Sequence, residues 1–281
     1  MYRVSKVLNN NGVIAIDMDE NKEYVILGKG VGFGKKVSQR FDKPEGCTTY
    51  RLEQETERGS AKELVKGIEP EYLEIADAIL TESQKVFGDS IDRGILFPLA
   101  DHISFAVARI RRNEQISNPL TEDIKVLFYS EFKVAETLKT ILRERLQIAI
   151  DDHEVGYVAL HIHSAIGDEK VSVAMQTARA VRECIDMIEK ATGKPIDVLS
   201  LSYNRLMNHM KYMVARASTG EKLNLDMNEY MLDQYPQAYK VATDICKNLE
   251  GCIGHKLDET ETGYLAMHIE RVANDEREIE E

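Results

Sequence analysis

The chain has 281 residues, enough for about two domains, and 43% of them are hydrophobic, enough for buried cores. Its 36 basic and 48 acidic side chains leave a net charge of −12, which argues against a protein that coats DNA through general positive charge. No apolar run approaches the ~18 residues that span a bilayer, no secretory signal is evident, and the four cysteines form no C-x-x-C pair, so we expect a cytoplasmic protein without membrane insertion.

The first 42 residues predict β structure. Short runs rich in Val, Ile and Tyr occur at 4–8, 13–17 and 23–27, and turn-forming residues separate them. A glycine-rich loop at 28–34 follows, and Lys35 and Lys36 come directly after it. Because so small a sheet buries little apolar area, we expect it to pair with a second copy.

The residues around this loop form a basic surface on an acidic protein. Residues 29–43 carry five basic side chains against one acidic side chain, which suits a ligand with a phosphate backbone. Asparagines at 9–11 are able to hydrogen-bond base edges, and Phe33 is able to stack on an unpaired base, as in the recognition of RNA loops and bulges. The alternatives are a plain turn at 9–12 and a Phe33 that packs inward.

From about Leu64 onward the pattern is helical. Apolar residues at spacings of three and four predict helices within 69–88, 98–112, 122–147 and 171–191. The polar residues before them suit a linker. We therefore expect a multidomain protein, with a small antiparallel all-β domain followed by two homologous all-α helix bundles. The predicted bounds are 1–56 for the β domain, 57–66 for the linker, and 67–170 and 171–281 for the helical domains.

The duplication follows from three blocks that recur at one offset of 107 residues, with no gap between them. The matched blocks are 101–109 with 208–216, 132–135 with 239–242, and 154–162 with 261–269. A period this long is not that of a solenoid unit, and it indicates two copies of one helical domain.

The repeat also sorts the seven histidines, because only four of them match across the copies. His102 matches His209, and His161 matches His268. Each histidine taken alone suits a structural role. The core positions that two copies of a domain share are, however, usually occupied by apolar residues rather than by titratable ones.

Three kinds of chemistry would use paired imidazoles. No H-E-x-x-H occurs and His161 and His163 are only two residues apart, so we expect no metal site. The cysteines at 184, 246 and 252 lie outside the matched blocks and no G-x-S-x-G occurs, so we expect no nucleophilic catalysis, no cofactor and no enzyme activity. Phosphorylation of the imidazoles, with Asp101 orienting the ring of His102, adds charge that rearranges an interface without turnover.

These motifs resemble the transcriptional antiterminators of the bacterial sugar phosphotransferase system over nearly the whole chain. Residues 6–11 and 28–36 look like the co-antiterminator RNA-binding domain, and the two copies look like tandem phosphotransfer-system regulation domains. Residues 30–36, 101–106 and 159–165 are similar to the glucose-type branch of this family.

The resemblance implies a homodimer that binds a stem-loop in a leader mRNA, excludes an overlapping terminator and lets transcription continue. His102 and His161 would be inhibitory phosphorylation sites fed by the sugar-specific transporter subunit, and His209 and His268 would be sites fed by the general phosphocarrier protein. The resemblance places ten residues near the RNA: Lys6, Asn9, Asn10, Asn11, Gly28, Lys29, Gly30, Phe33, Lys35 and Lys36.

Asn208 stands where the first copy has Asp101, which we expect to leave His209 without a neighbouring carboxylate and to make the reactivity of the two copies unequal.

The sequence leaves two other classes of function open. A DNA-binding transcription activator with the same regulatory domains requires a helix-turn-helix where the first 42 residues indicate strands. A phosphotransfer enzyme would pass phosphate onward from its histidines to a second protein.

Overall fold

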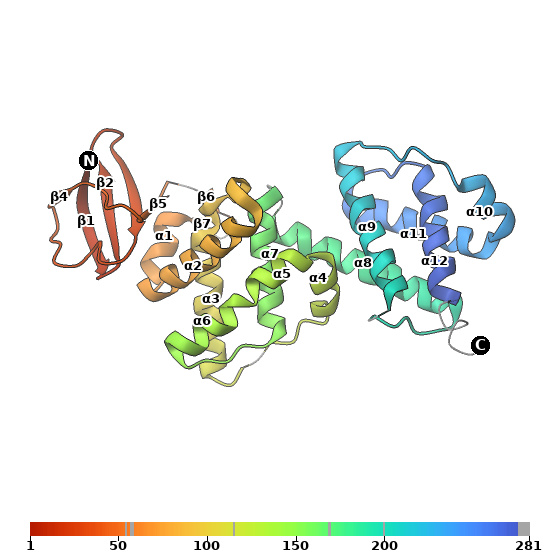
Figure 1. Cartoon of the computed structure of the whole chain (residues 1–281), viewed down its shortest axis with the longest axis horizontal. Helices are drawn as coiled ribbons and strands as arrows, with labels where there is room; N and C mark the ends of the chain where they lie inside the picture. Colours follow the sequence, from red (N-terminus) through yellow and green to blue (C-terminus); the bar gives the residue numbers. More distant parts are fainter. Residues whose placement is uncertain (54, 57–58, 115, 168–169, 199, 275–281) are drawn as a thin grey trace. The chain divides into compact units, whose positions relative to one another are not determined.

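We describe the chain from a computed structural model that covers residues 1–53, 55–56, 59–114, 116–167, 170–198 and 200–274. Residues 57 and 58 of the predicted linker lie outside these ranges, as do positions 54, 115, 168–169, 199 and 275–281 of the predicted domains. An N-terminal sheet is followed by helices, which confirms the predicted fold class (Figure 1). The chain forms two compact units, 1–117 with 130–171 and 118–129 with 172–281.

The N-terminal sheet is antiparallel throughout, in the order β4-β1-β2-β3-β5. Its inner face is apolar because alternate residues of β2 and β3 point to one side, where Val13, Ala15 and Ile26 pack with Val31 and Cys47. The three predicted strands are confirmed, and β5 is an addition whose short Thr-Thr-Tyr-Arg sequence gives little signal. The strands are β1 (Tyr2–Asn9), β2 (Gly12–Asp17), β3 (Lys22–Leu27), β4 (Arg40–Phe41) and β5 (Thr48–Arg51). Beyond them, β6 (Glu55–Thr56) pairs with β7 (Gly59–Ser60).

The first unit continues with helices that begin inside the predicted linker. Its α2 packs on α3 and α6, and α3 packs on α7. Pro70 lies in the first turn of α2, where its missing N–H costs nothing, and Gly88 ends this helix at a positive φ of 71°. The helices are α1 (Ala61–Gly67), α2 (Pro70–Phe87), α3 (Leu96–Arg111), α5 (Tyr129–Ala135), α6 (Thr137–Leu146) and α7 (Asp152–Gly167), with 3₁₀ turns at η1 (Gly88–Ser90) and η2 (Arg93–Ile95).

Polar contacts join the sheet to α2 within this unit. The hydroxyl of Tyr50 on β5 donates to Asp77 on α2, and its ring meets Phe97 edge-on at a centroid distance of 6.4 Å. Arg93 donates to the Tyr50 oxygen at 2.8 Å and to Asp77 at 2.9 Å. Burial, and then the Asp77 carboxylate, raise the pKa of Tyr50, so this hydroxyl stays protonated and keeps its hydrogen bond to Asp77.

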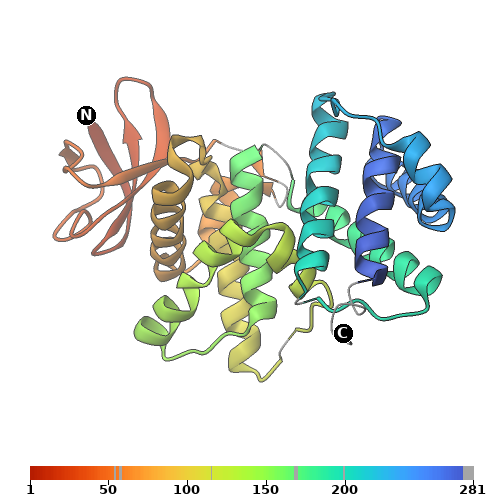
Figure 2. The same ribbon diagram turned by 45° about the vertical axis from the view of Figure 1, so that its right-hand side comes forward.

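The described part of the second unit contains helices without strands; α12 lies beside α9, as Figures 1 and 2 show, and packs on α11 as well. Ser200 caps α9 by accepting the N–H of Tyr203, and Gly220 ends it in the left-handed conformation. The buried hydroxyl of Tyr203 donates to the buried carboxylate of Asp123 at 3.0 Å, which joins α4 to α9. The helices are α4 (Thr121–Leu127), α8 (Val171–Thr192), α9 (Leu201–Thr219), α10 (Asn228–Gln234), α11 (Pro236–Ile253) and α12 (Thr260–Asn274).

The repeat is visible in the element bounds. The offset of 107 residues that separates His102 from His209 also separates both ends of α4 from those of α10. The same offset separates the start of α5 from the start of α11, and the end of α6 from the end of α11, so α5 and α6 together correspond to α11. The predicted stretch at 122–147 is thus three helices, with a tight turn at Glu136, whose carbonyl accepts from Lys139. The predicted domain bounds stay a prediction, since the compact units are not contiguous in sequence.

None of the helices over the described ranges combines the length and the apolar character that crossing a bilayer requires.

Candidate functional site

The β1–β2 turn and the glycine-rich loop are hydrogen-bonded to each other, so the structure brings together two predicted groups of RNA-contacting residues. Gly28 donates its N–H to the carbonyl of Asn11 at 2.9 Å, and Gly32 donates to the carbonyl of Asn10 at 3.0 Å. The side-chain oxygen of Asn11 accepts from Gly30 N–H at 3.0 Å. The backbone carbonyls of Asn10 and Asn11 and the side-chain oxygen of Asn11 therefore hold the loop.

This close approach explains why the loop is rich in glycine. A Cβ atom on Gly32 would lie 2.0 Å from the carbonyl oxygen of Asn9, so no side chain fits there. Gly30 and Gly34 have positive φ values of 74° and 68°, which other residues rarely adopt. The glycines of the loop are therefore required because the backbone turns tightly and lies against the asparagine turn.

The loop projects its aromatic residue away from the core. The side chain of Phe33 is 74% exposed, so the alternative that it packs inward is wrong. Lys6, Asn10, Lys29 and Lys36 are exposed as well, whereas Lys35 is half-buried, with its ammonium 5.2 Å from the centre of another ring, that of Phe41 on β4. These exposed side chains present cations, an amide and an aromatic face to a ligand in the observed conformation of the loop.

The four matching histidines come together as two pairs, one in each copy. The ring centroids of His102 on α3 and His161 on α7 lie 5.4 Å apart. Those of His209 on α9 and His268 on α12 lie 4.8 Å apart and are stacked. The side chains of His102 and His209 are each only 8% exposed, and His161 is buried, so these rings lie mostly below the surface.

A buried ion pair lies beside the first histidine pair. Arg109 on α3 donates to both carboxylate oxygens of Glu154 on α7, at 2.9 and 3.1 Å. The Nε2 atom of His102 lies 3.4 Å from the same carboxylate, but it has no hydrogen-bond partner among the described residues. Burial alone would raise the pKa of Glu154, but the imidazole of His102 and the guanidinium of Arg109 outweigh it and lower that pKa.

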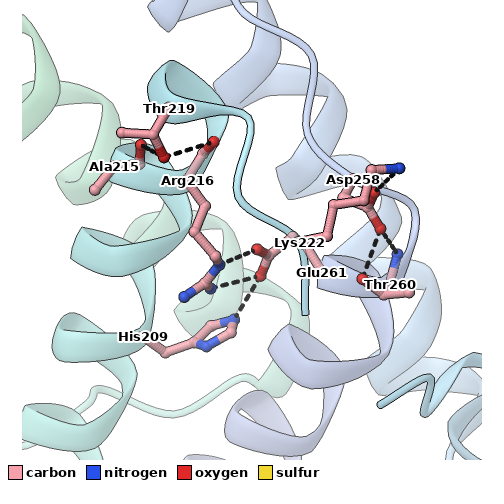
Figure 3. Close-up of polar contacts among 8 residues, drawn as sticks. All are labelled: His209, Ala215, Arg216, Thr219, Lys222, Asp258, Thr260 and Glu261. Carbon is pink, nitrogen blue, oxygen red and sulfur yellow. Dashed lines mark hydrogen bonds and ion pairs between the residues drawn. The ribbon is translucent and has the colours of Figure 1, made fainter. Parts of the chain in front are cut away.

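The second copy repeats this arrangement, as Figure 3 shows. Arg216 on α9 donates to Glu261 on α12 through Nε at 2.6 Å and through Nη2 at 2.9 Å, and Nε2 of His209 lies 3.6 Å from that carboxylate. The inference that His209 lacks a neighbouring carboxylate is therefore wrong, because a carboxylate reaches it from another helix. Asn208, the sequence neighbour, does not decide this property.

The histidines of the second pair are neutral near neutral pH. Burial, then the neighbouring His268 and Arg216, lower the pKa of His209 to about 3. Burial, then two arginines, lower the pKa of His268 to about 4. A neutral imidazole keeps a lone pair and is a nucleophile, so these rings are in the form that accepts a phosphoryl group.

Four residues of this cluster escaped the sequence reasoning. Glu154 and Glu261 face the first histidine of each pair, and Tyr157 and Tyr264 have rings 5.7 and 6.1 Å from the same imidazoles. All four belong to the matched blocks, so the repeat carried their signal although only histidines were sorted by it. By contrast the unmatched His163 lies 2.9 Å from Glu131 and outside the pairs.

Over the described ranges, no group of three or more His, Cys, Asp or Glu side chains is arranged to hold a metal ion.

The two copies differ in the space beside their ion pairs. A cavity of about 180 Å³ adjoins Arg216 and Glu261 and is lined in addition by Lys222 and Lys256. Next to Glu154 the space is about 10 Å³.

Family models match both parts of the chain. Residues 2–59 match the CAT RNA binding domain, and residues 77–165 and 182–272 match the PRD domain. The first match covers the sheet and its glycine-rich loop, and the second covers both histidine clusters.

Curated relatives extend this likeness over nearly the full length. The chain is 30% identical to the GlcA/glcB genes antiterminator of Staphylococcus carnosus, over 95% of this chain and 94% of that protein. It is 28% identical to protein GlcT of Staphylococcus haemolyticus, over 97% and 96% of the two chains, and 27% identical to transcription antiterminator LicT of Bacillus subtilis, over 96% and 98%. A crystal structure of GlcT CAT-PRDI superposes with a TM-score of 0.51 at 29% identity, over 59% of this chain and 98% of that one.

Proposed function

Because the chain belongs to the bacterial transcriptional antiterminators that combine a CAT RNA-binding domain with two PRD domains, we propose that it controls a sugar-transport operon at the level of leader RNA. A homodimer binds a stem-loop of the leader mRNA, the overlapping terminator does not form, and transcription continues. The glucose-type relatives among the antiterminators support the same branch for this chain.

The exposed side chains of the N-terminal domain support the RNA interface. Lys6, Lys29 and Lys36 pair with phosphates, and the amide of Asn10 reaches base edges. Phe33 stacks on an unpaired base, because its ring has no other cover. Gly28 and Gly30 act through the backbone shape that holds this loop against Asn11.

The histidine pairs are the proposed phosphorylation sites: His102, His161, His209 and His268. A neutral ring nitrogen attacks phosphorus in a phosphorylated donor, the donor's bond to phosphorus breaks, and a new N–P bond forms. The donors are the sugar-specific transporter subunit for the first PRD domain and the general phosphocarrier protein for the second. No further transfer from these rings is required, so the chain acts as a regulator rather than as an enzyme.

The buried ion pairs explain how a phosphate changes the structure. A phosphate adds a charge of about −2, and at His102 it would come within a few ångströms of the Glu154 carboxylate. Like charges in a buried site repel strongly, and Arg109 forms bidentate hydrogen bonds to phosphate as readily as to carboxylate. Phosphorylation therefore exchanges the arginine's partner, expels Glu154 and moves α7 against α3.

The second copy has more room and more cations for this exchange. The cavity beside Arg216 and Glu261 is also lined by Lys222, which pairs with Asp258 at 3.0 Å, and by Lys256, so a displaced Glu261 finds space and Lys256 as a counter-ion. We expect the second domain to accept phosphate with less rearrangement than the first.

The observation that carries the proposal is the recurrence of one cluster, two histidines beside a buried arginine–glutamate pair, in both PRD domains. A gel-shift of the full chain with the leader RNA of the operon that it is proposed to control tests the output. The matching duplex DNA is the control. Retarded RNA with unretarded DNA supports the proposal, and equal retardation of both contradicts it.

A further inference from the structure

Two of the proposed RNA-contacting side chains already have a partner within the chain. The side-chain amide of Asn9 donates to Oε1 of Glu74 on α2 at 2.7 Å, and that of Asn11 donates to Oε2 of the same carboxylate at 3.2 Å. Resting on the function proposed above, we propose that α2 of the first PRD domain is an autoinhibitory element in which Glu74 takes the place of an RNA acceptor.

The asparagines present donors because their oxygens are already used. Asn9 Oδ1 accepts from the backbone N–H of Asn11 at 2.8 Å, and Asn11 Oδ1 accepts from Gly30 at 3.0 Å. The amide N–H groups are the donors that face a ligand, and anionic or carbonyl oxygens are good acceptors for them. Phosphate oxygens and base carbonyls of RNA are such acceptors, and so is a carboxylate. Glu74 and RNA thus compete for the same atoms.

The carboxylate is held in this position by its surroundings. Arg145 on α6 lies 3.6 Å from the same Glu74 oxygen that Asn11 binds, and the Glu74 side chain is only 19% exposed. One turn further along α2, Asp77 accepts from Tyr50 of the sheet, and the i, i+3 spacing places both acids on one face of the helix. The face of α2 that carries Glu74 and Asp77 therefore meets the sheet at two points.

The contact opposes RNA in two ways. RNA reaches the amides of Asn9 and Asn11 only after α2 has moved away, and the fixed negative charge of Glu74 repels a phosphate backbone that approaches. Asn10, Lys29, Lys36 and Phe33 stay exposed meanwhile. The closed form thus keeps part of the interface for a first encounter and withholds the rest until the sheet leaves α2.

Replacing Glu74 by alanine in the full chain tests this inference. Both amide bonds to the charged acceptor disappear, so the closed form loses its hold on Asn9 and Asn11, and we expect affinity for the leader RNA to rise about tenfold or more. Glu82→Ala is the matched control, because Glu82 lies on the same helix and pairs only with Lys85 on the surface, at 2.6 Å, among its described contacts. It removes the same charge from the same helix, and we expect less than twofold change, about the effect of one distant screened charge.

Thermal unfolding checks that Glu74→Ala is folded, and Glu74→Gln, which keeps the shape but not the charge, is the second variant if it is not. A folded variant that binds RNA no more tightly than the unaltered chain overturns the autoinhibitory role. So does an equal gain in the Glu82→Ala chain. The proposed function fails separately: in that case neither the unaltered chain nor the Glu74→Ala chain retards the leader RNA.

Discussion

The imidazole rings of His209 and His268 stack with their centroids 4.8 Å apart, although the two residues come from different helices of the second PRD domain. Burial keeps both rings neutral, and their lowered pKa values of about 3 and about 4 have a consequence for stability. The unfolded chain binds protons at these histidines near pH 6.5, whereas the folded chain does not, so folding becomes less favourable as pH falls below about 6.5 and down to about 4.

We therefore expect His209→Gln or His268→Gln to flatten the pH dependence of unfolding over that interval. Urea unfolding of the full chain, followed at several pH values, measures this slope. His255→Gln is the control, because His255 is exposed in the same unit and lies outside the pairs. An identical slope in all three variants would show that the buried pair does not control acid stability.

Removal of Arg216 should destabilise the second unit strongly, because Glu261 is only 1% exposed and would keep an uncompensated charge. Breaking such a buried pair costs about 3–5 kcal/mol. Urea unfolding of Arg216→Ala gives the loss, and the double variant with Glu261→Gln should recover part of it because the unpaired charge is gone. Equal losses in the single and double variants would contradict this account of the ion pair.

Gly32→Ala should separate the glycine-rich loop from the asparagine turn. The added Cβ would lie 2.0 Å from the carbonyl oxygen of Asn9, which is backbone and does not yield without moving the turn. We expect a loss of about 1–3 kcal/mol in stability and weaker binding of leader RNA. Gly46→Ala is the control, since it has a positive φ of 78° but nothing within 4 Å of its Cβ, and it should cost only about 1 kcal/mol. Similar losses at both positions would argue against the close approach.

Phe33→Ala should weaken RNA binding without changing stability, because the ring is 74% exposed and contributes little to the core. Loss of stacking on one base costs about 1–3 kcal/mol, or about five- to 150-fold in affinity. Gel-shift titration measures the affinity and thermal unfolding the stability. Val37→Ala, at a side chain 63% exposed near the same loop, should change neither. Unchanged RNA affinity in the Phe33 variant would remove the stacking role.

His102→Ala or His161→Ala should abolish repression in the absence of the inducing sugar, because the first PRD domain no longer accepts the inhibitory phosphate. A reporter behind the leader of the operon that the chain is proposed to control measures induction with and without sugar. His153→Ala is the control, since His153 has no equivalent in the second copy. Sugar-dependent expression that persists in the first two strains would remove the inhibitory role assigned to this pair.

Most of the architecture was predictable from local pattern. Runs rich in Val, Ile and Tyr within 4–27 indicated the strands, and apolar spacing after Leu64 indicated the helices, because both depend on neighbours within a few residues. Where the pattern was weak, the prediction was incomplete. The four residues of β5 form a strand because β3 lies beside them, and 122–147 divides into three helices although its apolar spacing hardly changes.

The sequence by itself determined the duplicated helical part, the four equivalent histidines and the glycine pattern of the basic loop. A repeat is found by comparing the sequence with itself, and glycine marks the positions where the backbone turns or approaches closely. Only the tertiary structure decided that Glu154 and Glu261 face the histidines and that Glu74 occupies the amides of Asn9 and Asn11. These contacts join residues 52 to 65 positions apart. Packing of whole helices and strands sets such distances, and no local periodicity encodes them.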